Sequence, residues 1–242
     1  MRVTEVAGMP VPQCWLDVQD ALEAGVDRVI LYGPPGIGKT YAGLNYGLSA
    51  SGIAERLTCT EDMTTQDVAG GFMPSGLDGA FQFKPGSCLR GWIIGSRVVI
   101  DEIDKAGGDV FAQMLAFTDT IDSASFTRPD TGEVIRPQDG YSVVMTSNIE
   151  NPNELPVALK DRFPVAIEIN AAHPSALLRL PEQIRLVAAN YVANPPGQRV
   201  SLRAFYAFEQ LRTNPNIDVQ RAARLSFRHM ADDILNSISI GT

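Results

Sequence analysis

The sequence predicts an α/β fold, a parallel sheet covered by helices on both faces, followed by a small helical lid. Up to about residue 170, short apolar runs rich in β-branched residues alternate with segments of helical spacing, which is typical of a parallel sheet buried on both sides. Beyond residue 170 only helical spacing remains. We therefore expect an αβα core over residues 1–170 and a helical lid over residues 171–242.

Five runs in the first part have the length and composition of buried strands. They lie at residues 28–32, 57–60, 97–100, 142–145 and 165–169. Helical segments are expected at 41–48, despite two glycines, and at 109–118, where apolar residues recur every three or four positions.

Three helices are expected in the second part, at residues 176–189, 201–212 and 219–236. The breakers between them are Pro195-Pro196-Gly197 and Asn214-Pro215-Asn216.

Composition is that of an ordinary globular protein. Of 242 residues, 45% are hydrophobic and 20% are charged, which excludes a disordered chain. No apolar run reaches the roughly 18 residues of a membrane span, and no basic stretch followed by an apolar run resembles a signal peptide. We expect a cytoplasmic protein without a membrane partner. The three scattered cysteines and two isolated histidines do not form a disulfide framework or a zinc motif.

The net charge of −8 is unevenly distributed. Residues 1–170 carry a net −11, whereas residues 171–242 carry a net +3 with arginine as the only basic residue type. The basic segment could pack against an acidic core, including that of a neighbouring subunit, or could be a solvated surface. The acidic total argues against broad nonspecific binding of nucleic acid but leaves a local basic patch possible.

The most specific motif is a glycine-rich octapeptide between the first strand and the following helix. Its glycines let successive backbone N–H groups point at phosphates, and its lysine and hydroxyl residue reach the β and γ phosphates and a Mg²⁺ ion. With the residue that follows it, the motif supplies the candidate nucleotide contacts Gly33, Pro34, Pro35, Gly36, Ile37, Gly38, Lys39, Thr40 and Tyr41. A nucleotide triphosphate site is therefore predicted, with Thr40 as a metal ligand.

A second motif is the apolar strand that ends in Asp101-Glu102. Adjacent residues at a strand end point to different sides, so the two carboxylates can have different roles. Asp101 is expected to hold Mg²⁺ beside Thr40, and Glu102 to polarise the water that attacks the γ-phosphate.

Asn148 follows the next strand, where a side-chain amide could contact the γ-phosphate and orient that water. Its alternative role is that of an ordinary turn or capping asparagine.

These motifs resemble those of the AAA+ ATPases, and within them of the dynein-related, MoxR-like group. Gly33 to Thr40 is similar to Walker A, Val98 to Glu102 to Walker B, and Thr146-Ser147-Asn148 to sensor 1. The resemblance covers nearly the whole chain and implies a P-loop NTPase core with a helical lid, with ATP and Mg²⁺ as cofactors.

Two arginines gain roles from this resemblance. Leu159 to Phe163 is similar to the segment that presents an arginine finger to the neighbouring subunit, which makes Arg162 the candidate. Ser201 to Ala204 resembles sensor 2, which implies that Arg203 contacts phosphate within its own subunit. Arg162 could alternatively be an ion-pair partner of Asp161 or of another acid.

Two insertions correspond to those of the MoxR-like group, at residues 72–92 and at residues 123–141, where a hairpin is expected. In the family such loops face a central channel or a partner. Phe81 and Phe83 should share one face of a short strand, either for such a contact or to pack the insertion itself.

The resemblance implies a homo-oligomeric ring, expected to be a hexamer, that remodels or activates a partner protein, for which a von Willebrand factor A domain protein is a candidate. No separate N-terminal substrate domain is expected. Two alternatives stay open: a DNA-acting motor, for which Arg128 and Arg136 near the second insertion are the argument, and a nucleotide-gated scaffold with slow hydrolysis.

Overall fold

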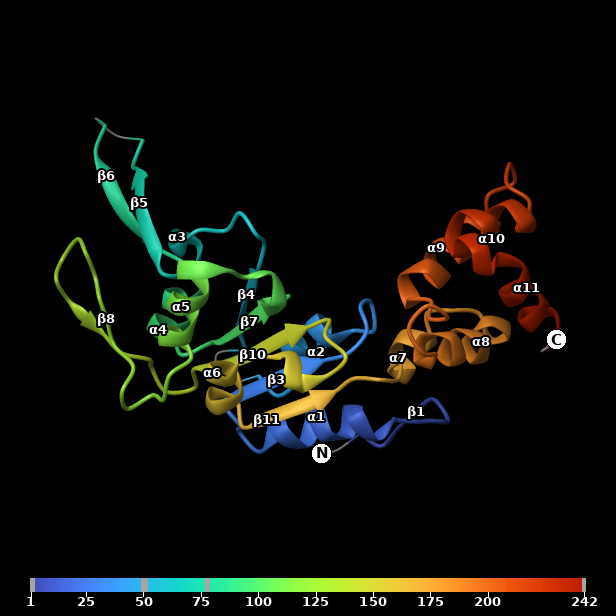
Figure 1. Cartoon of the computed structure of the whole chain (residues 1–242), viewed down its shortest axis with the longest axis horizontal. Coiled ribbons are helices and arrows are strands. Elements are labelled where there is room, and N and C mark those ends of the chain that lie inside the picture. Colours follow the sequence, from blue (N-terminus) through green and yellow to red (C-terminus); the bar gives the residue numbers. More distant parts are fainter. Residues whose placement is uncertain (1–2, 49–51, 77–78, 241–242) are drawn as a thin grey trace. The chain divides into compact units, whose positions relative to one another are not determined.

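The computed structural model describes residues 3–48, 52–76 and 79–240 (Figure 1). The chain forms two compact units. The first, here called the helical unit, comprises Met1–Asp17, Pro34–Gly38 and Ile169–Thr242, and the second, the sheet unit, comprises Val18–Gly33 and Lys39–Glu168. Among the described residues, no helix has both the length and the apolar character that crossing a membrane requires.

The sheet unit contains a five-stranded parallel sheet, which confirms the predicted α/β fold class. In spatial order its strands are β11 (Val165–Glu168), β3 (Arg28–Tyr32), β10 (Ser142–Ser147), β7 (Arg97–Asp101) and β4 (Ala54–Thr58). The prediction of a strand at residues 57–60 was wrong at both ends. β4 is an edge strand in which only Leu57 is buried, so the apolar residues of the sequence do not show where this strand begins and ends.

Both faces of this sheet are covered, because successive side chains of a strand point to opposite faces. Val99 and Val144 face the helix that follows the phosphate-loop motif, since a Cβ added at Gly43 would lie 3.2 and 3.1 Å from their methyl groups. Val98, on the opposite face, belongs to a core cluster with Trp92. The helices of the core are α1 (Gln13–Glu23), α2 (Lys39–Asn45), α3 (Thr65–Val68), α4 (Ser87–Ile94), α5 (Gly108–Phe117) and α6 (Val157–Arg162), with the 3₁₀ turns η1 (Ile103–Lys105) and η2 (Pro152–Glu154).

The two insertions form antiparallel hairpins that extend beyond α4 and α5 (Figure 1). The first consists of β5 (Gly70–Pro74) and β6 (Phe81–Pro85), and the second of β8 (Phe126–Thr127) and β9 (Val134–Ile135), as predicted for that segment. Part of the first insertion, residues 77–78, lies outside the described residues.

Of the two phenylalanines in β6, only Phe83 packs inside the protein. Phe83 is buried and the Arg128 guanidinium lies over its ring, 5.6 Å from the centroid, which joins the two hairpins. Phe81 is 67% exposed. Packing within the insertion therefore accounts for Phe83 and leaves Phe81 facing solvent.

The helical unit begins with a short antiparallel pair, β1 (Glu5–Val6) and β2 (Met9–Pro10). Its core contains three phenylalanines: the ring of Phe227 lies 5.0 Å from that of Phe205 and 4.9 Å from that of Phe208. The helices of this unit are α7 (Pro174–Leu177), α8 (Glu182–Ala193), α9 (Leu202–Arg212), α10 (Val219–Phe227) and α11 (Ala231–Ile240), with the 3₁₀ turn η3 (Arg228–Met230) between the last two.

Two of the helices predicted here are divided. The segment at 176–189 is interrupted before α8 because Pro181, the N-cap residue, has no N–H to donate to the preceding turn. The segment at 219–236 is interrupted at Arg228, whose φ of 57° is left-handed and ends α10.

Candidate active site

The phosphate-loop motif connects β3 to α2, as its sequence predicts. Gly33, Gly36 and Gly38 have φ angles of 127°, 74° and 115°, which residues with a side chain rarely adopt. These glycines therefore let the loop curl. Among its other members, Pro34 and Ile37 are buried and Pro35 is exposed.

Lys39 begins α2 and is buried, although it carries a charge. Its Nζ donates to the Gly33 carbonyl oxygen over 2.8 Å and to Asn148 Oδ1 over 3.1 Å. The Gly33 N–H in turn donates to the Ile149 carbonyl oxygen over 3.1 Å. The loop and the end of β10 are thus joined at two points, and Asn148 is placed beside Lys39.

Asp101, at the end of β7, is 4% exposed. Its Oδ1 accepts hydrogen bonds from Thr40 Oγ1 at 2.7 Å and from Thr146 Oγ1 at 2.5 Å, and its Oδ2 pairs with Arg56 at 2.5 Å. Burial raises the pKa of Asp101, but the hydrogen bonds from Thr146, Thr40 and Arg56 outweigh it, so the pKa is lowered. The carboxylate is therefore charged at neutral pH.

The residues expected to hold Mg²⁺ fit that ion in chemistry. Thr40 and Asp101 offer a hydroxyl and a carboxylate oxygen, the hard ligands that Mg²⁺ prefers. The described residues contain no group of three or more His, Cys, Asp or Glu side chains able to hold a metal by themselves.

Glu102 has a left-handed backbone, with φ 59° and ψ 47°, which is rare for a residue other than glycine. Its N–H donates to Thr146 Oγ1 over 3.2 Å, and its Oε2 forms an ion pair with Lys105 Nζ at 2.5 Å. The pair raises the pKa of Lys105. Strained backbone of this kind clusters at functional sites. Here Asp101 is buried, whereas Glu102 is partly exposed.

Asp104 holds the residues around Asn148. Its Oδ1 accepts from Ser147 Oγ at 2.8 Å and from the Asn148 N–H at 3.3 Å. Neither Asp104 nor Arg56 was predicted, because each acts through a contact with a residue more than forty positions away that no local pattern marks.

Arg162 lies at the end of α6. One of its terminal nitrogens donates to the Ala158 carbonyl oxygen over 3.2 Å, whereas its Nε is buried without a hydrogen-bond partner. Within the part of the chain that the structure describes, it forms no ion pair with Asp161 or another acid, so the alternative role for this arginine has no support.

Arg203 and the N-terminus of α9 lie beside the loop segment of the helical unit. A Cβ added at Gly36 would lie 2.9 Å from Ser201 Cβ and 3.8 Å from Arg203 Cγ. Trp15 of the same unit is fully buried, and its Nε1 donates to the Ala171 carbonyl oxygen over 2.7 Å. Within the helical unit, the predicted sensor-2 arginine therefore lies beside Gly36.

Tyr41 is not brought together with the other candidates. It is 64% exposed on α2 and packs edge-on against Tyr46, with ring centroids 6.4 Å apart.

Comparisons with known proteins place the chain in a family. The family model described as AAA domain (dynein-related subfamily) matches residues 28–163, more than half of the chain. The chain belongs to this family. The matched AAA domain runs from β3 to the residue after α6, so it contains Lys39, Asp101, Glu102, Asn148 and Arg162, while Arg203 lies outside it.

Among curated proteins, part of this chain is similar to Midasin from Giardia intestinalis, at 28% identity over 93 residues. That match covers 38% of this chain and 2% of Midasin.

Two solved structures resemble the chain. A provisionally assigned ATPase from Cytophaga hutchinsonii has a TM-score of 0.50 and 17% identity, covering 95% of this chain and 58% of the other. NtrX from Brucella abortus, solved in complex with ATP, has a TM-score of 0.49 and 12% identity, covering 99% of this chain and 70% of the other. At this identity the first of them shows the fold alone.

Proposed function

We propose that this chain is a Mg²⁺-dependent ATPase of the AAA+ class, similar to the MoxR-like group, that forms a hexameric ring and remodels a partner protein. The observation that carries the proposal is the 2.7 Å contact between Thr40 Oγ1 and Asp101 Oδ1. It places the hydroxyl of the phosphate loop beside the carboxylate at the end of β7, two strands away from β3 in the sheet, and a Mg²⁺ ion could use both oxygens. The family match supports the ATPase class.

Each residue has a defined task in this proposal. Lys39 and the loop N–H groups would bind the phosphates, and Thr40 and Asp101 would hold a Mg²⁺ ion that offsets part of the phosphate charge when bound. Glu102 accepts the proton of the attacking water after its carboxylate leaves Lys105, and Asn148 orients that water. Because Lys39 Nζ already contacts Asn148 Oδ1, a γ-phosphate bound by Lys39 comes within reach of the same amide.

The two arginines are proposed to contact the phosphates of one nucleotide from two different subunits. Arg162 is proposed to reach the nucleotide of the next subunit and stabilise the transition state, since the described residues provide no hydrogen-bond partner for its buried Nε. Arg203, beside Gly36, is proposed to couple the helical unit to the state of the nucleotide.

Remodelling of a protein is favoured over movement of DNA. Arg128, one of the two arginines that support a DNA motor, pairs with Asp130 at 2.6 Å and packs on Phe83, so its charge is compensated within the hairpin. Exposed Phe81 and Phe72, at 67% and 47%, offer apolar contacts at the first hairpin instead. A partner with a von Willebrand factor A domain fits the MoxR-like resemblance.

The proposal is tested by the ATPase rate measured against protein concentration, with and without DNA, together with light scattering for assembly. A steep rise with concentration and no response to DNA is expected, because each site needs Arg162 of a neighbour. DNA stimulation that falls steeply with salt would favour the motor. A negligible rate with nucleotide-dependent assembly would favour the scaffold.

A further inference from the structure

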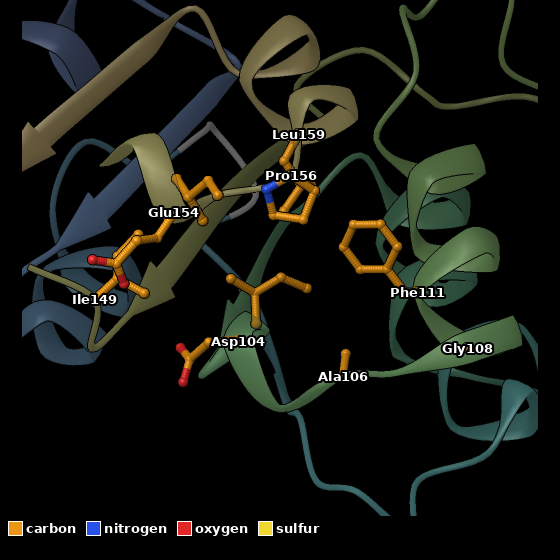
Figure 2. Close-up of a pocket in the computed structure, with 10 residues that line it drawn as sticks. Asp104, Ala106, Gly108, Phe111, Ile149, Glu154, Pro156 and Leu159 are labelled. Atoms are coloured by element: carbon orange, nitrogen blue, oxygen red, sulfur yellow. The ribbon is translucent and has the colours of Figure 1, made fainter. Parts of the chain in front are cut away.

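The sheet unit contains a pocket of about 340 Å³ that is lined by none of the residues assigned above to catalysis (Figure 2). Three of its lining residues, Ile103, Leu155 and Leu159, are buried. The remaining lining residues are Asp104, Ala106, Gly108, Phe111, Ile149, Glu154 and Pro156. Apolar side chains therefore provide most of the wall, with two carboxylates as the charged groups.

These carboxylates give the pocket two unlike ends. Figure 2 shows Asp104 and Glu154 on one side and the ring of Phe111 on the opposite side. Both acids are exposed, and within the described residues neither forms an ion pair. Asp104 uses Oδ1 for Ser147 and Asn148, and the described residues provide no partner for its Oδ2.

We propose that this pocket binds an arginine side chain of a protein partner and that its occupancy slows ATP hydrolysis. A volume of about 340 Å³ is at the lower end of ligand pockets, about 300–1,000 Å³, which suits one long side chain. An arginine would lay its apolar stem along the walls and direct its planar guanidinium at the carboxylates. The sheet unit as a whole carries a net −10, which also favours a basic partner.

Two lining residues connect the pocket to the proposed catalytic groups, so this inference rests on the proposed function. Asp104 holds Ser147 and the Asn148 N–H, and the Ile149 carbonyl oxygen accepts from the Gly33 N–H. A guanidinium on Asp104 would compete for the carboxylate that places Asn148. Occupancy is therefore expected to reduce the rate rather than to increase it.

The other wall connects the pocket to the neighbouring subunit. Leu159 lies in α6, the helix that ends in Arg162, and Pro156 is its N-cap residue. A partner's side chain in the pocket would thus contact two elements: η1, which contains Asp104 beside the subunit's own site, and α6, which ends in the arginine proposed to reach the site of the next subunit.

Binding is tested with short peptides on the full chain carrying ¹³C-labelled methyl groups. The probe is acetyl-Ala-Arg-Ala-amide, and the control is the same peptide with citrulline, which has the shape of arginine without its charge. We expect the arginine peptide to shift the methyl signals of Ile103, Ile149 and Leu159 and to bind at least about fivefold more tightly than the citrulline peptide. Glu154→Gln should remove this difference, whereas Glu61→Gln, at an exposed acid outside the pocket, should not.

The ATPase rate is measured with the same peptides. At saturation the arginine peptide should lower the rate at least about twofold in the unmodified chain and in Glu61→Gln, and should have no effect in Glu154→Gln. Unshifted methyl signals, or equal binding of the two peptides, would overturn the proposed ligand. Methyl shifts that appear with protein concentration alone would assign the pocket to a second copy of the chain and overturn the partner.

Two results separate this inference from the function it rests on. Peptide binding without any change in a measurable ATPase rate would overturn the regulatory role. Peptide binding to a chain that hydrolyses no ATP under any condition would instead contradict the proposed function, while the arginine pocket would stand.

Discussion

Lys39 Nζ and Asn148 Oδ1 lie 3.1 Å apart, although 109 positions separate these residues in the sequence. The lysine comes from the start of α2 and the asparagine from the end of β10, and the two strands that lead to them, β3 and β10, are parallel neighbours. The charge proposed to bind phosphate and the amide proposed to orient water therefore meet at the carboxyl ends of these two strands.

Replacement of this lysine tests the phosphate contact. Lys39→Ala should weaken binding of a non-hydrolysable ATP analogue by roughly 10- to 100-fold, the effect of losing hydrogen bonds from a charged donor. Calorimetric titration measures it. Lys160→Ala, which changes an exposed lysine of α6, serves as the control and should leave the affinity unchanged. Equal affinities in the two variants would remove Lys39 from the site.

Glu102→Gln should separate binding from hydrolysis. An amide of the same shape cannot accept the proton, so the turnover rate should fall by roughly 10²- to 10⁴-fold while the affinity for ATP stays within about a factor of three. Phosphate release and nucleotide titration measure the two quantities. Full turnover by this variant would contradict the role of general base.

Mixing two inactive variants tests Arg162 as a group that acts between subunits. Arg162→Ala and Glu102→Gln should each be nearly inactive alone, because fingers of this kind contribute on the order of 10³ or more in rate. In an equal mixture, sites that combine an intact Glu102 with an intact Arg162 of the neighbour should restore about one quarter of the unmodified rate in a ring. A mixture no more active than its components would mean that the arginine acts within its own subunit.

The cysteines should be unreactive in the folded chain. Burial raises the pKa of Cys59 to about 12, with Asp101, Asp104 and Glu102 adding to the effect, and Cys14 and Cys88 are also buried with raised pKa values. Alkylation of Cys59 at pH 8 should therefore be on the order of 10³ slower than in the unfolded chain, because the thiolate reacts. Mass spectrometry of the alkylated chain measures these rates. Rapid labelling of Cys59 in the folded chain would contradict its burial.

The same raised pKa sets a direction for stability. The unfolded thiol loses its proton near its ordinary pKa of 9, whereas the folded thiol of Cys59 keeps it to about pH 12. The contribution of Cys59 to stability is thus complete below pH 9 and is lost as the pH rises towards 12. Denaturant titrations at pH 8 and pH 10.5 should show the loss, and Cys59→Ala should reduce it.

A pair of glycines tests the packing of the first hairpin. Gly70 has φ 116°, and a Cβ there would lie 2.4 Å from the Lys84 carbonyl oxygen, whereas Gly132 has φ 72° with nothing within 4 Å. Gly132→Ala should cost only the backbone strain, about 1–2 kcal/mol, while Gly70→Ala should cost about 1–3 kcal/mol more for the steric conflict. Thermal unfolding measures both. Equal losses would place the Lys84 backbone further from Gly70 than described.

Sequence patterns predicted the parts of this protein that depend on neighbouring residues. The octapeptide fixes the loop of Gly33 to Thr40 because its glycines alone tolerate the required φ angles. Buried strands such as β7 and β10 reveal themselves by continuous apolar runs, since both of their faces are covered. Less of the helical unit was predictable, because Pro181 and Arg228 divide helices whose apolar spacing continues across the break.

Only the tertiary structure decided which distant side chains share a site. Three features join residues about forty or more positions apart. They are the ion pair of Arg56 with Asp101, the hydrogen bond of Ser147 to Asp104, and the pocket beside α6. By itself, the sequence determined the fold class and the candidate nucleotide-binding residues, because short-range backbone geometry and apolar periodicity are local properties. Contacts across a parallel sheet depend on the order and register of its strands, and these are fixed only when the whole core packs.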